Sequence, residues 1–74
     1  MTRLPTLTAA KLLKVLLRLG FIEEHGKGSH KFLKHPDGRT TTVPCHRGED
    51  IGRGLLRKIL RDIEMEPEEL TRLL

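Results

Sequence analysis

The sequence predicts a small two-layer α+β domain, in which two helices cover one face of a three-stranded antiparallel sheet. Two observations predict this fold. Amphipathic segments with helical spacing lie in the first and last thirds of the chain, and three short segments between them alternate roughly between polar and apolar residues. Seventy-four residues are enough for one domain. We therefore expect residues 1–74 to form a single domain of order α-β-β-β-α, extended by a short C-terminal helix.

The first helix is expected from Ala9 to Leu19. Thr8 is a suitable N-cap residue, and Gly20 is suited to the position that follows a helix C-terminus. At 100° per residue the apolar side chains gather on one face and the basic ones on the opposite face. The apolar face contains Ala9, Leu12, Leu13, Leu16 and Leu19, and the basic face contains Lys11, Lys14 and Arg18.

Three strands are expected over residues 21–25, 31–35 and 39–43. Glycine-containing turns at 26–29 and 36–38 separate them, and the β-branched residues of the last segment favour a strand. This pattern predicts an antiparallel meander. Phe32 and Leu33 are adjacent in the middle strand, so their side chains must point to opposite faces of the sheet. The sequence alone does not decide which of the two is buried.

A second amphipathic helix is expected from Gly54 to Ile63, and a short final helix from Glu66 to Leu74. Pro67 suits the first turn of this final helix, and the acidic residues beside it complement the helix dipole. We expect the leucines of the final helix to dock on the core. The second helix has an apolar face of Leu55, Leu56, Ile59, Leu60 and Ile63, a basic face of Arg53, Arg57, Lys58 and Arg61, and the docking leucines are Leu70, Leu73 and Leu74.

Charge and composition narrow the classes of function. Residues 1–61 carry thirteen basic and five acidic side chains, whereas residues 62–74 carry one basic and five acidic. A basic body of this kind attracts phosphate backbones, although it equally suits a solvated surface. Two aromatic residues, Phe21 and Phe32, argue against a base-stacking platform. A single cysteine and the lack of a long apolar run predict a cytoplasmic protein with no membrane partner.

Several polar residues are candidates for chemistry. The histidines at 25, 30 and 35 and the Cys45-His46 pair do not match the spacing of a zinc site, so we expect no metal and no cofactor. Cys45 as a nucleophile would need a nearby base, which the sequence does not indicate. His30 directly follows the turn at 26–29, whose amide groups could hold a phosphate oxygen. From the residues alone, however, an ordinary exposed histidine is the favoured interpretation, because glycine-rich hairpin turns are common.

Four short motifs resemble the HicA family of toxins. They are Gly28-Ser29-His30, then Lys34-His35-Pro36-Asp37-Gly38, then Thr42-Val43-Pro44 with His46, and finally the segment Leu55-Leu56-Arg57-Lys58-Ile59-Leu60. The resemblance extends over nearly the whole chain. The glycines at 52 and 54, which flank the start of the second helix, depart from the family pattern.

The resemblance implies a double-stranded-RNA-binding-like fold and an mRNA interferase that is neutralised by a HicB-type antitoxin. It also implies that His30 is the catalytic residue, acting as general base and acid on a ribose hydroxyl without a metal. The RNA-binding residues expected around it are Lys27, Gly28, Ser29, Lys31, Lys34 and Arg39. Two alternatives stay open: a module that binds RNA without cutting it, and a degenerate toxin that retains only its antitoxin contact.

Overall fold

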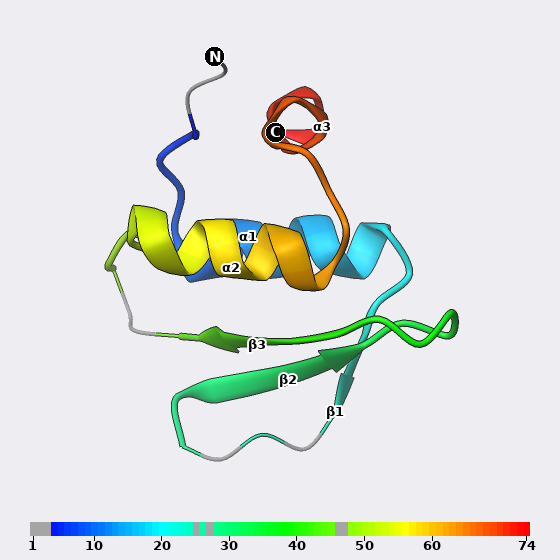
Figure 1. Ribbon diagram of the computed structural model, residues 1–74. Helices are drawn as coiled ribbons and strands as arrows, with labels where there is room; N and C mark the ends of the chain where they lie inside the picture. The colour runs from blue at the N-terminus through cyan, green and yellow to red at the C-terminus, as the bar shows by residue number, and fades with distance from the viewer. Residues whose placement is uncertain (1–3, 25, 27, 46–47) are drawn as a thin grey trace.

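A computed structural model describes residues 4–24, 26, 28–45 and 48–74, and it shows the predicted order of elements. Each predicted helix and strand is present with ends that shift by a few residues at most (Figure 1). The three strands form one antiparallel sheet in the order β1-β2-β3, which confirms the meander. The elements are α1 (Ala9–Arg18), β1 (Ile22–Glu24), β2 (His30–Lys34), β3 (Thr40–Pro44), α2 (Arg53–Asp62) and α3 (Pro67–Leu73).

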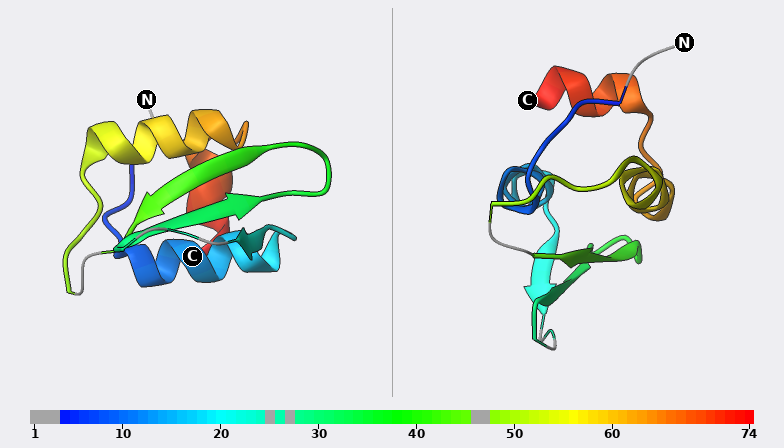
Figure 2. Two further views of the ribbon diagram at one scale, coloured as in Figure 1. Left: turned by 90° about the horizontal axis from the view of Figure 1, so that it is seen from below. Right: turned by 90° about the vertical axis from the view of Figure 1, so that its left-hand side faces the viewer.

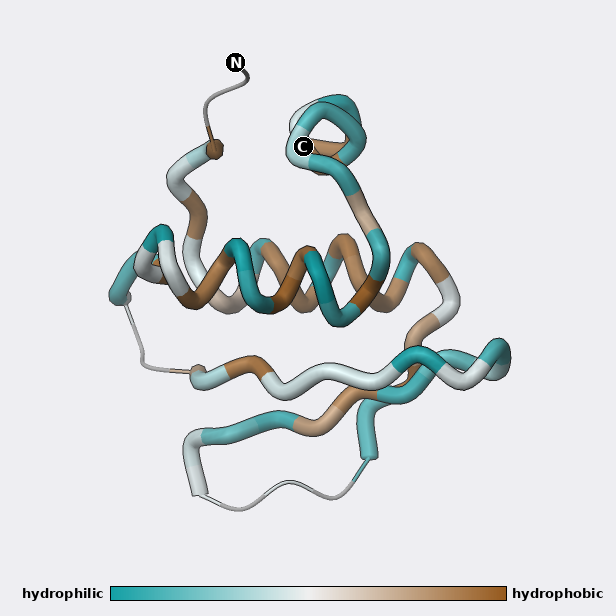
Figure 3. The backbone as a smooth tube through the Cα atoms, in the orientation of Figure 1, coloured by the Kyte–Doolittle hydropathy of each residue, from teal (hydrophilic) through white to brown (hydrophobic). Residues whose placement is uncertain are grey.

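Helices α1 and α2 lie side by side on one face of the sheet, so the predicted two-layer α+β fold is confirmed. Helix α3 crosses this pair on the side away from the sheet, and the described elements leave the second face of the sheet open (Figures 1 and 2). Hydrophobic and hydrophilic residues alternate along the tube of α2, as an amphipathic helix requires (Figure 3). In the described part of the chain, no helix has the length and apolar content needed to traverse a bilayer.

Helix α1 begins and ends where its caps predict. The Thr8 hydroxyl accepts a hydrogen bond from the Lys11 amide at 3.3 Å, which satisfies one amide of the first turn. Gly20 has φ of +100°, the left-handed conformation that follows many helix C-termini. Leu12 and Leu16 are fully buried between the sheet and α2, whereas the basic face is exposed.

The strand register settles which face of β2 is buried. Leu33 is fully buried against the helices, together with Thr41 and Val43 of β3. Phe32 therefore points to the open face, because successive strand residues alternate between faces. His30 and Lys34 lie on the same open face as Phe32, since they are two residues away from it on either side.

Helix α2 begins one residue earlier than expected, with Gly52 as its N-cap. Helix α3 begins at Pro67, and the Glu66 amide donates to the Glu69 carboxylate at 3.2 Å. Leu70 is fully buried, as predicted, but Leu74 is 55% exposed, so its predicted docking is wrong. The reason is that α3 ends at Leu73 over the edge of α1, where the last residue overhangs the core (Figure 2).

Candidate active site

His30 is the first residue of β2 and stands exposed at one end of the open sheet face. It pairs with Pro44 of β3, and the Cys45 amide donates a hydrogen bond to the Ser29 carbonyl. This bond continues the β2–β3 ladder one residue beyond the strand and fixes the main chain just before the histidine. Among the described residues, none forms a hydrogen bond with the imidazole of His30.

The turn before His30 depends on two glycines for different reasons. A Cβ atom on Gly26 would lie 2.0 Å from the His30 carbonyl oxygen, so the backbone of the turn approaches β2 more closely than any side chain permits. Gly28 has φ of +59°, a conformation that costs other residues about 1–2 kcal/mol. Gly28 and Ser29 are both exposed, so their backbone is accessible to a ligand beside His30.

A polar hollow of about 330 Å³ adjoins His30 between the turn and the first two strands. Lys31 reaches it from the other face of β2 and lies 3.5 Å from the Glu23 carboxylate, with both side chains 43% exposed. The hollow thus combines one imidazole and one ammonium with two carboxylates. Its lining residues are Glu23, Glu24, Gly26, Gly28, His30 and Lys31. Lys27, also predicted to bind RNA, lies outside the described residues.

The other two predicted RNA-binding residues lie farther from His30. Lys34 shares its face, but it is four positions farther along the strand, which corresponds to a distance of about 13 Å. Arg39 lies beyond Lys34, at the far end of the sheet, and the structure does not bring it to His30. Its guanidinium bonds the Asp37 carboxylate at 2.8 Å and the Ile63 carbonyl at the end of α2.

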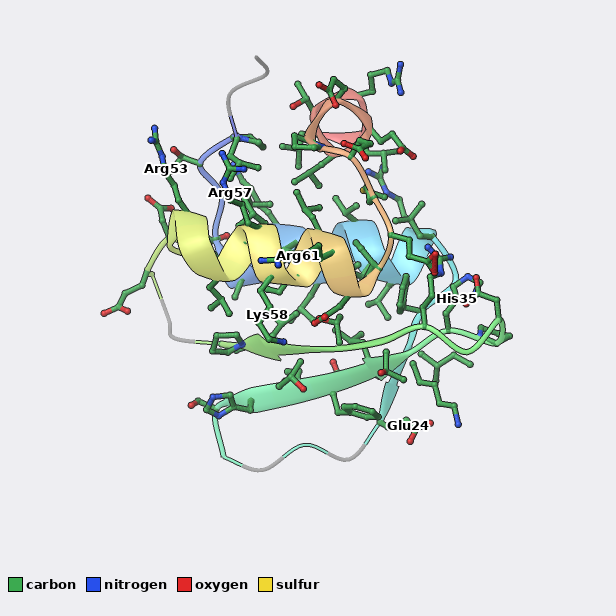
Figure 4. The ribbon with its side chains drawn as sticks, in the orientation of Figure 1. Glu24, His35, Arg53, Arg57, Lys58 and Arg61 are labelled. Atoms are coloured by element: carbon green, nitrogen blue, oxygen red, sulfur yellow. The ribbon has the colours of Figure 1, made fainter. Side chains whose placement is uncertain are left out.

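His35, which is labelled beside the β2–β3 turn in Figure 4, is held by the fold in a way that His30 is not. Its Nε2 atom lies 3.0 Å from the Leu19 carbonyl at the end of α1, and its Nδ1 accepts from the Asp37 amide at 3.1 Å. The ring also packs edge to face on Phe21, at 4.9 Å between centroids. His35 and Arg39 therefore attach the β2–β3 turn to the C-terminal carbonyls of both main helices, groups that a helix leaves unpaired.

The remaining sequence candidates do not assemble a second site in the described part of the chain. Cys45 is half-buried, and burial raises the pKa of its thiol, which disfavours the reactive thiolate. No three metal-binding side chains among the described residues come together. His25 and His46 lie outside the described residues.

The basic face of α2 is exposed as expected, and its arginines follow one another at intervals of one turn (Figure 4). Lys58 bonds the Asp62 carboxylate at 3.1 Å, one turn farther along the helix. The sequence pattern missed the two glutamates of the hollow. Their position follows from the antiparallel register, which pairs Glu23 with Leu33 and Glu24 with Phe32 and which an alternation pattern alone does not fix.

Comparison with known protein families identifies a match over most of the chain. The sequence profile of a family described as the HicA toxin of bacterial toxin–antitoxin systems matches residues 9–65, more than half of the chain. No curated protein matches the chain in sequence. The matched range contains all three strands, the turn before His30 and both main helices.

Proposed function

The chain belongs to the HicA family of toxins of bacterial toxin–antitoxin systems, and on this basis we propose that it is an endoribonuclease that cuts mRNA with His30. The observation that carries the proposal is the contrast between its two described histidines. His35 is held by main-chain groups of the fold, whereas His30 stands exposed beside a glycine turn and a polar hollow. An imidazole suits acid–base chemistry at neutral pH.

The proposed reaction uses the ribose of the substrate as its nucleophile. His30 takes the proton of the 2′-hydroxyl, and the resulting oxygen attacks the neighbouring phosphorus. The bond to the 5′-oxygen breaks, leaving a 2′,3′-cyclic phosphate, and the leaving oxygen receives a proton, which the protonated His30 can supply. Donors aimed at the phosphate stabilise the charge that builds up on it.

The donors proposed for the phosphate are those that adjoin His30. They are the amides of Gly28 and Ser29 and the ammonium of Lys31, together with Lys27 from the sequence. Lys31 lies next to Glu23 at 3.5 Å, and an exposed pair of this kind is weak, so a phosphate can replace the carboxylate. The exposed basic face of α2 supplies further contacts to the RNA backbone, which are independent of sequence.

The partner of the proposed enzyme is a HicB-type antitoxin. An inhibitor of this reaction has to cover His30, and acidic residues on it would complement the basic surface of the toxin. The cytoplasmic location predicted from the sequence suits a protein that acts on mRNA.

A cleavage assay in EDTA tests the proposal. The purified chain should shorten a long mRNA, and His30→Ala should slow cleavage by about 10²- to 10⁴-fold, the usual contribution of one acid–base residue. The circular dichroism spectrum and the affinity for uncut RNA should stay nearly unchanged. RNA that stays intact with the wild-type chain would favour the non-catalytic binding module. Growth arrest that persists with His30→Ala would exclude His30 as the source of toxicity.

A further inference from the structure

The open face of the sheet contains an aromatic ring that the core does not use. Phe21 is 3% exposed and belongs to the core, whereas Phe32 is only half-buried and stands outside the core cluster and its flanking residues. Its cross-strand neighbours are Glu24 and Thr42, both exposed. Phe32 is therefore a large ring on a surface that the described part of the chain leaves uncovered.

This ring shares a row with the proposed catalytic residue. His30, Phe32 and Lys34 occupy alternate positions of the central strand, so their side chains leave the same face at intervals of about 7 Å. A phosphate held at His30 brings its attached nucleosides to the adjoining part of this face. The ring of Phe32 is the next side chain that they meet, and the ammonium of Lys34 is the one after it.

We infer that the open face of the sheet binds a single-stranded stretch of RNA, with Phe32 stacking against one base beside the scissile phosphate and Lys34 contacting the backbone beyond it. The inference rests on the proposed function of His30. Aromatic rings bind bases in this way without regard to sequence, because every base has a π face. The low aromatic content argues against an extended platform, but one ring is enough for one base.

The charges around Phe32 favour a base over a phosphate at this position. Glu24 is directly opposite Phe32 in the register and lies at the foot of β1 (Figure 4). Its carboxylate repels a phosphate placed on the ring, and it can accept a hydrogen bond from a base amino group. Cationic or titratable side chains lie on both sides of the ring along β2. Along β2 the open face thus presents His30, the ring of Phe32 and Lys34 in turn. This order matches a phosphate, a base and the next phosphate of an RNA strand.

The inference requires unpaired RNA. In a duplex the faces of the bases are stacked on one another, so a protein ring cannot reach them. The exposed basic face of α2 does not require unpaired RNA, because it contacts only the phosphate backbone. The affinity for single-stranded RNA should therefore depend on Phe32, and the affinity for duplex RNA should not.

Binding measured in the His30→Ala background tests this without cleavage. The probe is a fluorescein-labelled 12-nucleotide RNA of mixed sequence, used as a single strand and as a duplex, and the readout is anisotropy. Phe32→Ala should weaken single-strand binding by about 5- to 150-fold, and Phe32→Trp should preserve it. Ile22→Ala is the matched control, because Ile22 is an exposed apolar residue of the same face. It should change the affinity by less than about twofold, against the 5-fold minimum for a stacked ring.

Two further variants make the result decisive. Phe32→Leu keeps an apolar side chain and the fold, as thermal melting will show, yet it should lose single-strand affinity much as Phe32→Ala does. Lys34→Ala should reduce the salt dependence of log Kd by about 0.7 per log unit of salt, whereas Phe32→Ala should leave that slope unchanged.

Two results would overturn the inference: a single-strand affinity that is unchanged in a folded Phe32→Leu, or an equal loss of affinity for duplex RNA. Failure of His30→Ala to slow cleavage would instead contradict the proposed function. Binding is then measured with 2′-O-methyl RNA, which has no free 2′-hydroxyl to act as nucleophile, so the two failures stay distinguishable.

Discussion

His35→Ala is the substitution whose effect on stability the structure predicts most directly. It removes two hydrogen bonds, one with the Leu19 carbonyl and one from the Asp37 amide, each worth about 1 kcal/mol. It also removes the edge-to-face contact with Phe21, worth about 0.5–1.5 kcal/mol. Because the side chain of His35 is only 19% exposed, water does not fully replace these contacts. The free energy of unfolding should therefore fall by about 3 kcal/mol.

Thermal unfolding followed by circular dichroism measures this loss. For a domain of this size, about 3 kcal/mol corresponds to a decrease in Tm of roughly 12–24 °C. His30→Ala is the matched control, since His30 is exposed and no described residue bonds its ring. Its Tm should stay within about 4 °C of the wild type, because surface substitutions usually change stability by less than about 0.5 kcal/mol. Equal Tm values for His35→Ala and the wild type would refute the structural role of His35.

Three further predictions concern other positions. Gly26→Ala should lower the Tm and slow cleavage, because the new Cβ would clash with the His30 carbonyl. Gly54→Ala has open space around it in α2 and should raise the free energy of unfolding by about 0.4–1 kcal/mol. Equal changes in Tm for the two variants in thermal denaturation would contradict this contrast. The pKa of Asp37 is lowered by its hydrogen bonds from Arg39, against a smaller effect of desolvation, so its contribution is present above the ordinary Asp pKa and is lost as the pH falls through the lowered value. Asp37→Asn should therefore flatten the acid limb of the stability curve, and an unchanged limb in acid titrations would disprove it. Cys45 should react with iodoacetamide more slowly in the folded chain than in urea, because burial raises the pKa of its thiol, and Cys45→Ala should keep full cleavage; a large loss of cleavage would implicate the thiol.

The sequence was sufficient for the order of elements, because caps, glycine turns and apolar periodicity are local signals. Thr8 and Gly20 mark the ends of α1 in the sequence as they do in the structure. The faces of β2 were not predictable, since Phe32 and Leu33 are both apolar and only the packing of the helices shows which is buried. The residue type of Leu74 predicts a place in the core, but α3 ends one residue before it and leaves it exposed.

The candidate site shows the same division between local and long-range information. His30 and its glycine turn were identifiable because they are contiguous in the chain. The structural role of His35 was not identifiable from the sequence. Its partner Leu19 is sixteen residues away and comes close only because the β2–β3 turn packs on the end of α1. The charge of Arg39 and its place beside the third strand predict RNA binding. The sequence does not show that Arg39 lies at the opposite end of the sheet from His30, because that depends on the strand register.

The most direct test of the central claim is the initial rate of mRNA cleavage in EDTA by His30→Ala and His35→Ala, both measured well below the melting temperature of either variant. We predict that His30→Ala loses about 10²- to 10⁴-fold in rate while it melts like the wild type, and that His35→Ala cuts at nearly the wild-type rate. Cleavage by His30→Ala at the wild-type rate would contradict the account.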